Sequence, residues 1–239
     1  MSYKPKVSII IPAYNASNYL EEAINSALAQ TYDNIEVLVI NDGSKDDGAT
    51  RQIALSYGDK IRYFEKENGG VSTALNHGIK HMTGEYFSWL SHDDLYLKNK
   101  IQMQVAKLNE YRENVVVYCG SNTIDKDSKI IRENTTAFPD AVLAPLEALQ
   151  YVTEKGMGGC AFLIPKTAFD KVGLFDENLR YCQDIFMWWK IFLAGFSLVF
   201  CNEVGVLSRV HANQVTQTGA TLYHHDAQYI GERIVEEFA

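Results

Sequence analysis

The sequence lacks the features that nucleic-acid-binding and membrane-spanning proteins need. Its 22 lysine and arginine residues are outnumbered by 30 aspartate and glutamate residues, and no block of basic residues occurs. Binding along a phosphate backbone depends on such basic residues, so we expect no nucleic-acid partner. The most hydrophobic stretch, residues 185–200, contains Lys190 and Gly195 and is shorter than the roughly 20 apolar residues of a membrane-spanning helix, so we expect no transmembrane segment.

Cysteine is also scarce, and its spacing excludes the usual zinc motifs. The four cysteines, at positions 119, 160, 182 and 201, form no CxxC pair, so we expect reduced and mostly buried thiols. The first residues lead directly into an apolar run and lack the hydrophobic region and cleavage site of a signal peptide. The sequence therefore predicts a cytoplasmic protein.

The composition is that of a folded protein, with 46% hydrophobic and 22% charged residues. The first part of the chain alternates short apolar runs with amphipathic helical patterns. We expect strands at residues 7–11, 35–40, 61–64 and 86–90, with a helix after each of the first three. This alternation predicts right-handed βαβ units, and hence an α/β fold with a mostly parallel central sheet flanked by helices.

The second part of the chain has weaker patterns. We expect helices at about 98–111, before Gly173 and at 184–194, strands at 115–119 and 160–164, a hairpin tip at 125–128 and a loop at 139–145. No segment resembles an interdomain linker. We therefore expect one domain over residues 1–222, with a nucleotide-binding half at about 1–97 and a second half at about 98–222.

Residues 223–239 form a C-terminal tail with a helical pattern of its own. The tail places Ala227, Ile230, Ile234 and Phe238 at helical spacing. This pattern predicts an amphipathic helix that either docks on the domain or pairs with another chain in a homo-oligomer.

Acidic residues follow two of the expected strands. Asp42 comes after the second strand, and Asp93 and Asp94 come after the fourth. Ligands of such sheets bind at the carboxyl ends of the strands, and adjacent carboxylates suit a hard divalent cation. The alternative for Asp93 and Asp94 is a solvated loop or a helix cap. A competing acidic pair, Asp125 and Asp127, has the flanks of a hairpin tip.

Five further residues are candidates for a ligand site. Tyr14, just after Pro12 and the first strand, could stack on a planar base or belong to the core. Asp184 begins an apolar helix, where the helix dipole alone would favour an acid. Arg209 and His211 alternate on an extended segment, so they point the same way and could hold a diphosphate or decorate the surface.

Taken in order, these features resemble glycosyltransferase family 2, the inverting nucleotide-sugar transferases with the GT-A fold. The resemblance runs from residue 7 to about residue 216. Its elements are VSIIIPAYN (7–15), VINDGS (39–44), NGGVSTALNHG (68–78), GEY (84–86), SHDD (91–94), GLFDE (173–177), QD (183–184) and RVH (209–211).

The resemblance implies roles for the candidate residues. Pro12, Tyr14 and Asp42 match positions that hold the nucleobase, usually uracil. Asp93 and Asp94 match the ribose and metal acids, with Asp94 as a direct ligand of Mn²⁺ or Mg²⁺. The match makes Asp184 the catalytic base, makes Arg209 and His211 diphosphate contacts, and adds His211 to the metal ligands.

Two positions depart from the family pattern. Gln183 stands where glutamate is usual, which keeps the base at Asp184 but removes a neighbouring charge. Leu75 stands where many members have arginine, which puts a direct phosphate contact from that helix in doubt.

The resemblance implies a metal-dependent inverting glycosyltransferase. It would move a sugar from a nucleotide diphosphate donor, a UDP-sugar, to a hydroxyl of a glycan, lipid-linked or protein-linked acceptor bound by the second half of the domain. The acidic chain has no basic amphipathic patch to support direct membrane binding, and only the lipid-linked acceptor that the resemblance allows would place the protein peripherally at the inner face of the membrane. A nucleotidyltransferase and a catalytically silent binding module are the alternatives, although residues 13–17 lack the basic, glycine-rich loop of a nucleotidyltransferase.

Overall fold

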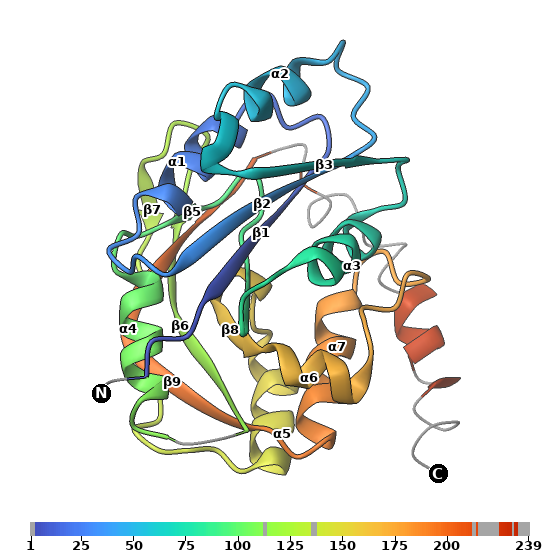
Figure 1. Cartoon of the computed structure of the whole chain (residues 1–239). Coiled ribbons are helices and arrows are strands. Elements are labelled where there is room, and N and C mark those ends of the chain that lie inside the picture. The colour runs from blue at the N-terminus through green and yellow to red at the C-terminus, as the bar shows by residue number, and fades with distance from the viewer. Residues whose placement is uncertain are drawn as a thin grey trace.

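The computed structural model describes residues 3–111, 114–134, 138–211, 214, 225–230 and 232–233. Its first half contains four parallel strands in the order β3-β2-β1-β4 (Figure 1). These strands are β1 (Val7–Ala13), β2 (Ile35–Asp42), β3 (Arg62–Lys66) and β4 (Tyr86–Trp89). Strand β1 is buried along its whole length, which explains why its sequence is apolar except for Ser8, whose hydroxyl group donates to Glu36 at 2.6 Å.

Three helices connect these strands, and the strand order decides which face each helix covers. The helices are α1 (Leu20–Leu28), α2 (Ala49–Leu55) and α3 (Val71–His81), and a short 3-10 helix, η1 (Gly58–Lys60), follows α2. Strand order advances in one direction from β1 to β3 and then returns past β1 to β4. Because such crossovers are right-handed, α3 lies on the opposite face from α1 and α2. The switch in direction opens a crevice at the carboxyl end of β1.

The second half extends the same sheet with mixed pairing, in the order β4-β8-β6-β9-β5. Strand β8 is antiparallel to both β4 and β6, whereas β6 and β9 are parallel. The elements are β5 (Leu95–Tyr96), α4 (Lys100–Leu108), β6 (Val115–Ile124), β7 (Ile130–Arg132), α5 (Pro145–Lys155), η2 (Gly159–Ala161), β8 (Phe162–Pro165), α6 (Lys166–Val172), α7 (Gln183–Leu193) and β9 (Ser197–Arg209). The predicted α/β class is confirmed, and parallel pairing dominates its first half.

The sequence analysis does not predict helix α5 and predicts only the loop at residues 139–145, where the helix begins. Pro145 opens this helix, and only Ala148 and Val152 are buried, while Leu146 is exposed. With so few buried positions, the helix has no strong apolar stripe for the sequence to reveal. The hairpin tip predicted after β6 is confirmed by a 2.9 Å hydrogen bond from Asp125 N to Lys129 O.

The remaining sequence expectations concern burial. All four cysteines are free and buried, as expected. In the C-terminal tail, residues 225–230 and 232–233 are helical, but the predicted stripe is wrong at Ala227, which is exposed. The buried positions are Asp226 and Ile230, one helical turn apart. Ile234 and Phe238 lie outside the described residues. Within the described ranges, no helix combines the length and hydrophobicity that crossing a bilayer requires.

Candidate functional site

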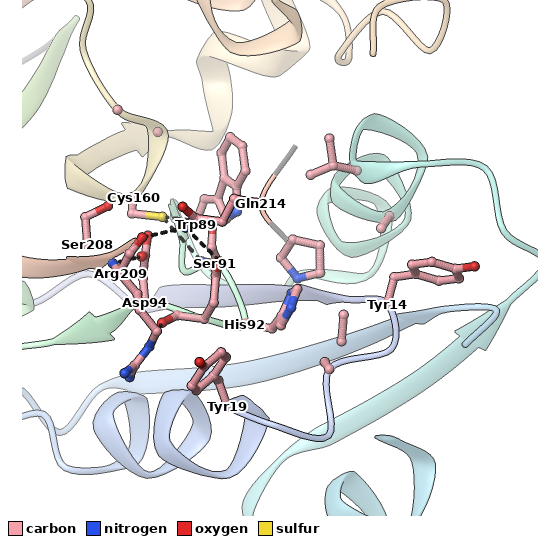
Figure 2. A pocket seen from close by; sticks show the side chains of 18 of the residues that line it. Tyr14, Tyr19, Trp89, Ser91, His92, Asp94, Cys160, Ser208, Arg209 and Gln214 are labelled. Atoms are coloured by element: carbon pink, nitrogen blue, oxygen red, sulfur yellow. Dashed lines mark hydrogen bonds between the residues drawn. The ribbon is translucent and has the colours of Figure 1, made fainter. Parts of the chain in front are cut away.

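A cavity of about 950 Å³ opens at the carboxyl ends of β1, β2 and β4 (Figure 2). The loop after β4 contributes two acidic residues to its lining, and the start of α7 contributes another. The end of β9 forms a further part of the lining. The structure brings all eight predicted site residues to this one cavity: Pro12, Tyr14, Asp42, Asp93, Asp94, Asp184, Arg209 and His211. Their individual roles stay predictions.

Asp93 lies on the side of the cavity formed by the end of β9 and the residues after it. Its Oδ2 atom lies 3.0 Å from His211 Nε2 and accepts a 3.1 Å hydrogen bond from Gln214 Nε2. Burial raises the pKa of Asp93, but the neighbouring His92 and the Gln214 and His211 hydrogen bonds outweigh it and lower the pKa below its usual range. Asp93 is therefore a stable anion at neutral pH.

Asp94 has the opposite electrostatic environment. Burial, and then the charge of Asp93, raise its pKa to about 7. A 2.8 Å hydrogen bond from the Arg209 backbone N–H to Asp94 Oδ1, with further hydrogen bonds from Cys160 and Ser208, opposes this rise. Figure 2 shows Cys160, Ser91 and Ser208 gathered around this carboxyl group. Two buried acids side by side form a site whose charge a cation would compensate.

The described residues contain no group of three or more histidine, cysteine, aspartate and glutamate side chains that could hold a metal by themselves. The His211 Nε2 atom lies 3.0 Å from Asp93 Oδ2, so His211 reaches the same side of the cavity as the acid pair, and its role as a metal ligand stays a prediction. The donor set that fits is the carboxylate pair Asp93 and Asp94. Mg²⁺ and similar ions are commonly bound by one or two carboxylates together with substrate phosphates, and this pair fits that mode.

The Arg209 side chain is buried inside the protein, and each of its three guanidinium nitrogens has a hydrogen-bond partner there. Nε donates to Asp93 O at 2.7 Å, and Nη2 pairs with the Glu22 carboxylate at 3.0 Å. Nη1 donates to the hairpin tip, at the carbonyls of residues 125 and 126 and the hydroxyl of residue 128. The guanidinium also stacks on Tyr19, 4.3 Å from the ring centroid (Figure 2). This geometry favours a positioning role over the predicted diphosphate contact.

We expect Arg209→Met to destabilise the protein by about 2–4 kcal/mol, because it leaves several partly buried acceptors unpaired while Glu22, half exposed, contributes little. For a chain of this size the midpoint of thermal unfolding should fall by about 5–15 °C. Differential scanning calorimetry measures this, with the exposed Arg51→Met as control. An unchanged unfolding midpoint together with a loss of UDP binding would instead support the predicted contact between Arg209 and the diphosphate.

Asp42 is buried and organises the loop that follows β3. Its carboxylate accepts hydrogen bonds from Lys66 Nζ at 2.6 Å, from Gly69 N at 3.0 Å and from Gly70 N at 2.7 Å. Gly70 has a φ of 91°, a conformation that favours glycine. Asn68 Nδ2 adds a further hydrogen bond to Asp42 at 3.1 Å. The carboxylate therefore fixes the edge of the cavity where α3 begins.

Asp184 lies at the first turn of α7 and faces the same cavity. Its Oδ1 atom accepts a 2.8 Å hydrogen bond from the backbone N–H of Ile185. Burial raises the pKa of Asp184 to about 6, and backbone hydrogen bonds oppose the rise. Gln183 is buried, and its Oε1 atom has no hydrogen-bond partner among the described residues. A carboxylate with a raised pKa in a cavity is suited to accept a proton.

The cavity also contains residues that the sequence analysis did not weigh individually. His92 lies between Asp94 and Tyr14 in Figure 2, and burial lowers its pKa, so its imidazole is neutral near pH 7. Trp89 and Cys160 line the cavity beside Asp94. Position in the sequence could have pointed to His92, which directly precedes the acid pair. Cys160 carries no comparable signal because its contact with Asp94 joins distant parts of the chain.

Comparisons with known proteins agree on one family. The model described as "Glycosyl transferase family 2" matches residues 8–173. An uncharacterized glycosyltransferase of Rickettsia typhi is 50% identical over 238 residues, which cover 96% of this chain and 72% of that protein. A second one, from Rickettsia prowazekii, is 51% identical over 223 residues, covering 90% of this chain and 67% of that protein.

Solved structures show the same fold. The S. aureus TarS fragment 1–349 in complex with UDP has a TM-score of 0.69 at 21% identity, over 86% of this chain and 60% of that one. The same fragment in complex with UDP-GlcNAc has a TM-score of 0.72 at 20% identity, over 87% of this chain and 60% of that one. This likeness confirms the expected fold. The chain spans only part of each of these proteins.

Proposed function

Because the chain belongs to glycosyl transferase family 2 and is a glycosyltransferase, we propose that it transfers a sugar from a UDP-sugar to an acceptor hydroxyl, with a divalent cation and inversion at the anomeric carbon. The observation that carries the proposal is that Asp42, Asp94 and Asp184, from three separate segments, line one cavity. Solved structures of the similar TarS contain UDP and UDP-GlcNAc, which supports a UDP-sugar donor.

The nucleobase would bind at the edge of the cavity beside Pro12, Tyr14 and Asp42. Tyr14 is 41% exposed, so its ring is free to stack on a planar base. Asp42 already accepts several hydrogen bonds from residues 66–70 and would act mainly by holding that loop beside the base.

The ribose and diphosphate would lie next to the acid pair. Asp93 and Asp94 would hold Mn²⁺ or Mg²⁺ together with diphosphate oxygens, and the bound ion supplies charge neutralisation for the leaving diphosphate. Asp93 is oriented for this by His211 and Gln214, and Asp94 by Arg209. The chain thus supplies two carboxylates whose positions are fixed before the donor arrives.

The acceptor would enter from the second half of the domain, which supplies Asp184. Ser121 borders both the main cavity and a second one of about 380 Å³, whose lining combines polar and charged residues with aromatic residues such as Tyr118 and Tyr151. Sugar rings bind well against aromatic faces, so we assign the glycan, lipid-linked or protein-linked acceptor to this side. Its hydroxyl would lose a proton to Asp184 as it attacks, and a single displacement with one base inverts the configuration.

We expect the acceptor kcat/KM to fall below about pH 6, measured with saturating donor and Mn²⁺. Burial raises the pKa of Asp184 to about 6, so at lower pH its carboxyl group holds a proton and cannot accept another. Above that pH the group is ionised and the rate levels off. Circular dichroism at pH 5 checks that the protein stays folded. A rate that stays level down to pH 5 would contradict the assignment.

The experiment that tests the proposed function is a donor screen with UDP-sugars, with and without Mn²⁺, in which UDP release is measured. We expect release for one donor, dependence on the metal and loss with a chelator. Absence of release for every UDP-sugar, together with unimpaired UDP binding, would favour a silent module. Production of pyrophosphate from UTP and a sugar phosphate would favour a nucleotidyltransferase.

A further inference from the structure

The helical residues 225–230 and 232–233 lie against the turn that leads into α7 (Figure 1). Ile230 packs in a small apolar cluster with Leu179, Cys182 and Phe186. The Tyr229 hydroxyl donates to Asp176 Oδ2 at 3.0 Å. These contacts attach the C-terminal helix to the segment between α6 and α7.

Asp226 is the buried acid of this helix, and its side chain is 0% exposed. Its Oδ2 atom accepts three backbone hydrogen bonds, from Arg180 N at 3.0 Å, Tyr181 N at 2.6 Å and Cys182 N at 2.9 Å. Burial raises the pKa of Asp226, but these bonds outweigh it and the pKa is lowered. One carboxylate oxygen therefore gathers three consecutive N–H groups.

These three residues lead directly into Gln183 and Asp184. A helix start leaves N–H groups without intrahelical partners, and a side chain of the N-cap residue usually satisfies them. In α7 the N-cap residue is Cys182, whose side chain makes no such bond. The N–H groups that Asp226 binds belong to residues 180–182, which precede the first residue of the helix, so Asp226 holds the turn before α7 from a segment more than 40 positions later in the chain.

We propose that Asp226 is a positioning residue that holds the turn before α7 and so fixes Asp184 in the cavity. This inference rests on the proposed function, in which Asp184 is the base. Asp226 lines no part of the cavity and would act through the backbone of residues 180–182. Loss of its carboxylate frees those N–H groups and lets the base shift relative to the acceptor hydroxyl.

The test compares Asp226→Ala with Asp226→Asn and with Tyr229→Phe. Because small misplacements of a catalytic group cost about 10²-fold in rate, we expect Asp226→Ala to lower kcat by about 10- to 100-fold. UDP affinity by calorimetry should change less than kcat, because Asp93 and Asp94 lie on another segment and residues 180–182 reach the nucleotide side only through the 2.6 Å hydrogen bond from Arg180 Nη1 to Gly69 O. Asp226→Asn keeps an acceptor oxygen and should restore most of kcat. Tyr229→Phe, which removes a different contact of the same helix, should leave kcat nearly unchanged.

Hydrogen exchange of the amides of residues 180–182 provides a readout that does not depend on activity. Exchange should be faster in Asp226→Ala and close to normal in Asp226→Asn. If Asp226→Ala does not fold, Asp226→Glu serves in its place, because the longer side chain displaces the oxygen while keeping the charge. Reduced kcat with faster exchange is then expected.

The outcomes separate this inference from the proposed function. An active wild-type protein whose Asp226 variant keeps its kcat, or loses kcat only as much as Tyr229→Phe does, overturns the positioning role alone. Unchanged exchange at residues 180–182 overturns it as well. A wild-type protein that releases UDP from no donor overturns the proposed function, and the positioning role with it.

Discussion

Asp184→Asn is expected to lower the rate of sugar transfer by about 10²- to 10⁴-fold, the usual contribution of a general base. Asparagine keeps the shape of the side chain and its place at the start of α7 but cannot accept the acceptor proton. Burial raises the pKa of Asp184 to about 6, which places the base close to its working range. Steady-state transfer with a UDP-sugar and its acceptor measures the effect.

The substitution should leave donor binding intact, because the residues proposed to bind the nucleotide, Asp42, Asp93 and Asp94, come from other segments of the cavity lining. Calorimetry with UDP and Mn²⁺ checks this for the Asp184 variant. Asp59→Asn, at an exposed position outside the cavity, controls for the loss of an acid. Undiminished turnover in Asp184→Asn would show that Asp184 is not the general base.

Asp94→Ala is expected to weaken metal-dependent UDP binding by more than about 10- to 100-fold, the range found for residues that merely support a metal ligand. Burial and the charge of Asp93 raise the pKa of Asp94 to about 7, so ionisation of both carboxyl groups is unfavourable and a bound cation would relieve it. Calorimetric titration of UDP at several Mn²⁺ concentrations measures the effect.

A comparison without metal gives this experiment its control. The wild-type protein should bind UDP much more tightly with Mn²⁺ than without it, and Asp94→Ala should reduce or abolish that difference. Removal of the acid removes its repulsion of Asp93 but also leaves the Arg209 N–H without its 2.8 Å acceptor, so circular dichroism checks that the variant is folded. Equal UDP affinity with and without metal in the wild-type protein would count against a metal at the acid pair.

The positions of the acids could be predicted because local patterns determine them. Short runs dominated by apolar residues predict β1, β2 and β4, and parallel strands bring their carboxyl ends to one edge. Asp42 and Asp94 therefore follow from the order of elements alone. Asp184 could be placed only through the resemblance to a family, since an acid at a helix start has an ordinary structural explanation.

The contacts that hold the site could not be predicted in this way. The partners of Arg209 depend on the register of β9 beside β6 and on the hairpin tip, which no local pattern specifies. Asp226 occupies a buried position of a helix whose sequence suggests Ala227 there instead. The side chains of Arg209 and Asp226 are both buried because they form hydrogen bonds with backbone groups of distant segments. The hydrophobic periodicity of the sequence gives no information about such pairs.

The contacts of Arg209 also bear on the order in which the enzyme can mature during synthesis. This residue ends β9, yet it fixes both acids of the loop after β4 and reaches Glu22 in α1. A nascent chain on the ribosome could complete the first four strands long before residue 209 emerges. The first strands of the proposed donor site would then be folded, but Asp93 and Asp94 would still lack their hydrogen bonds with Arg209. Affinity for nucleotide should therefore arise late in translation.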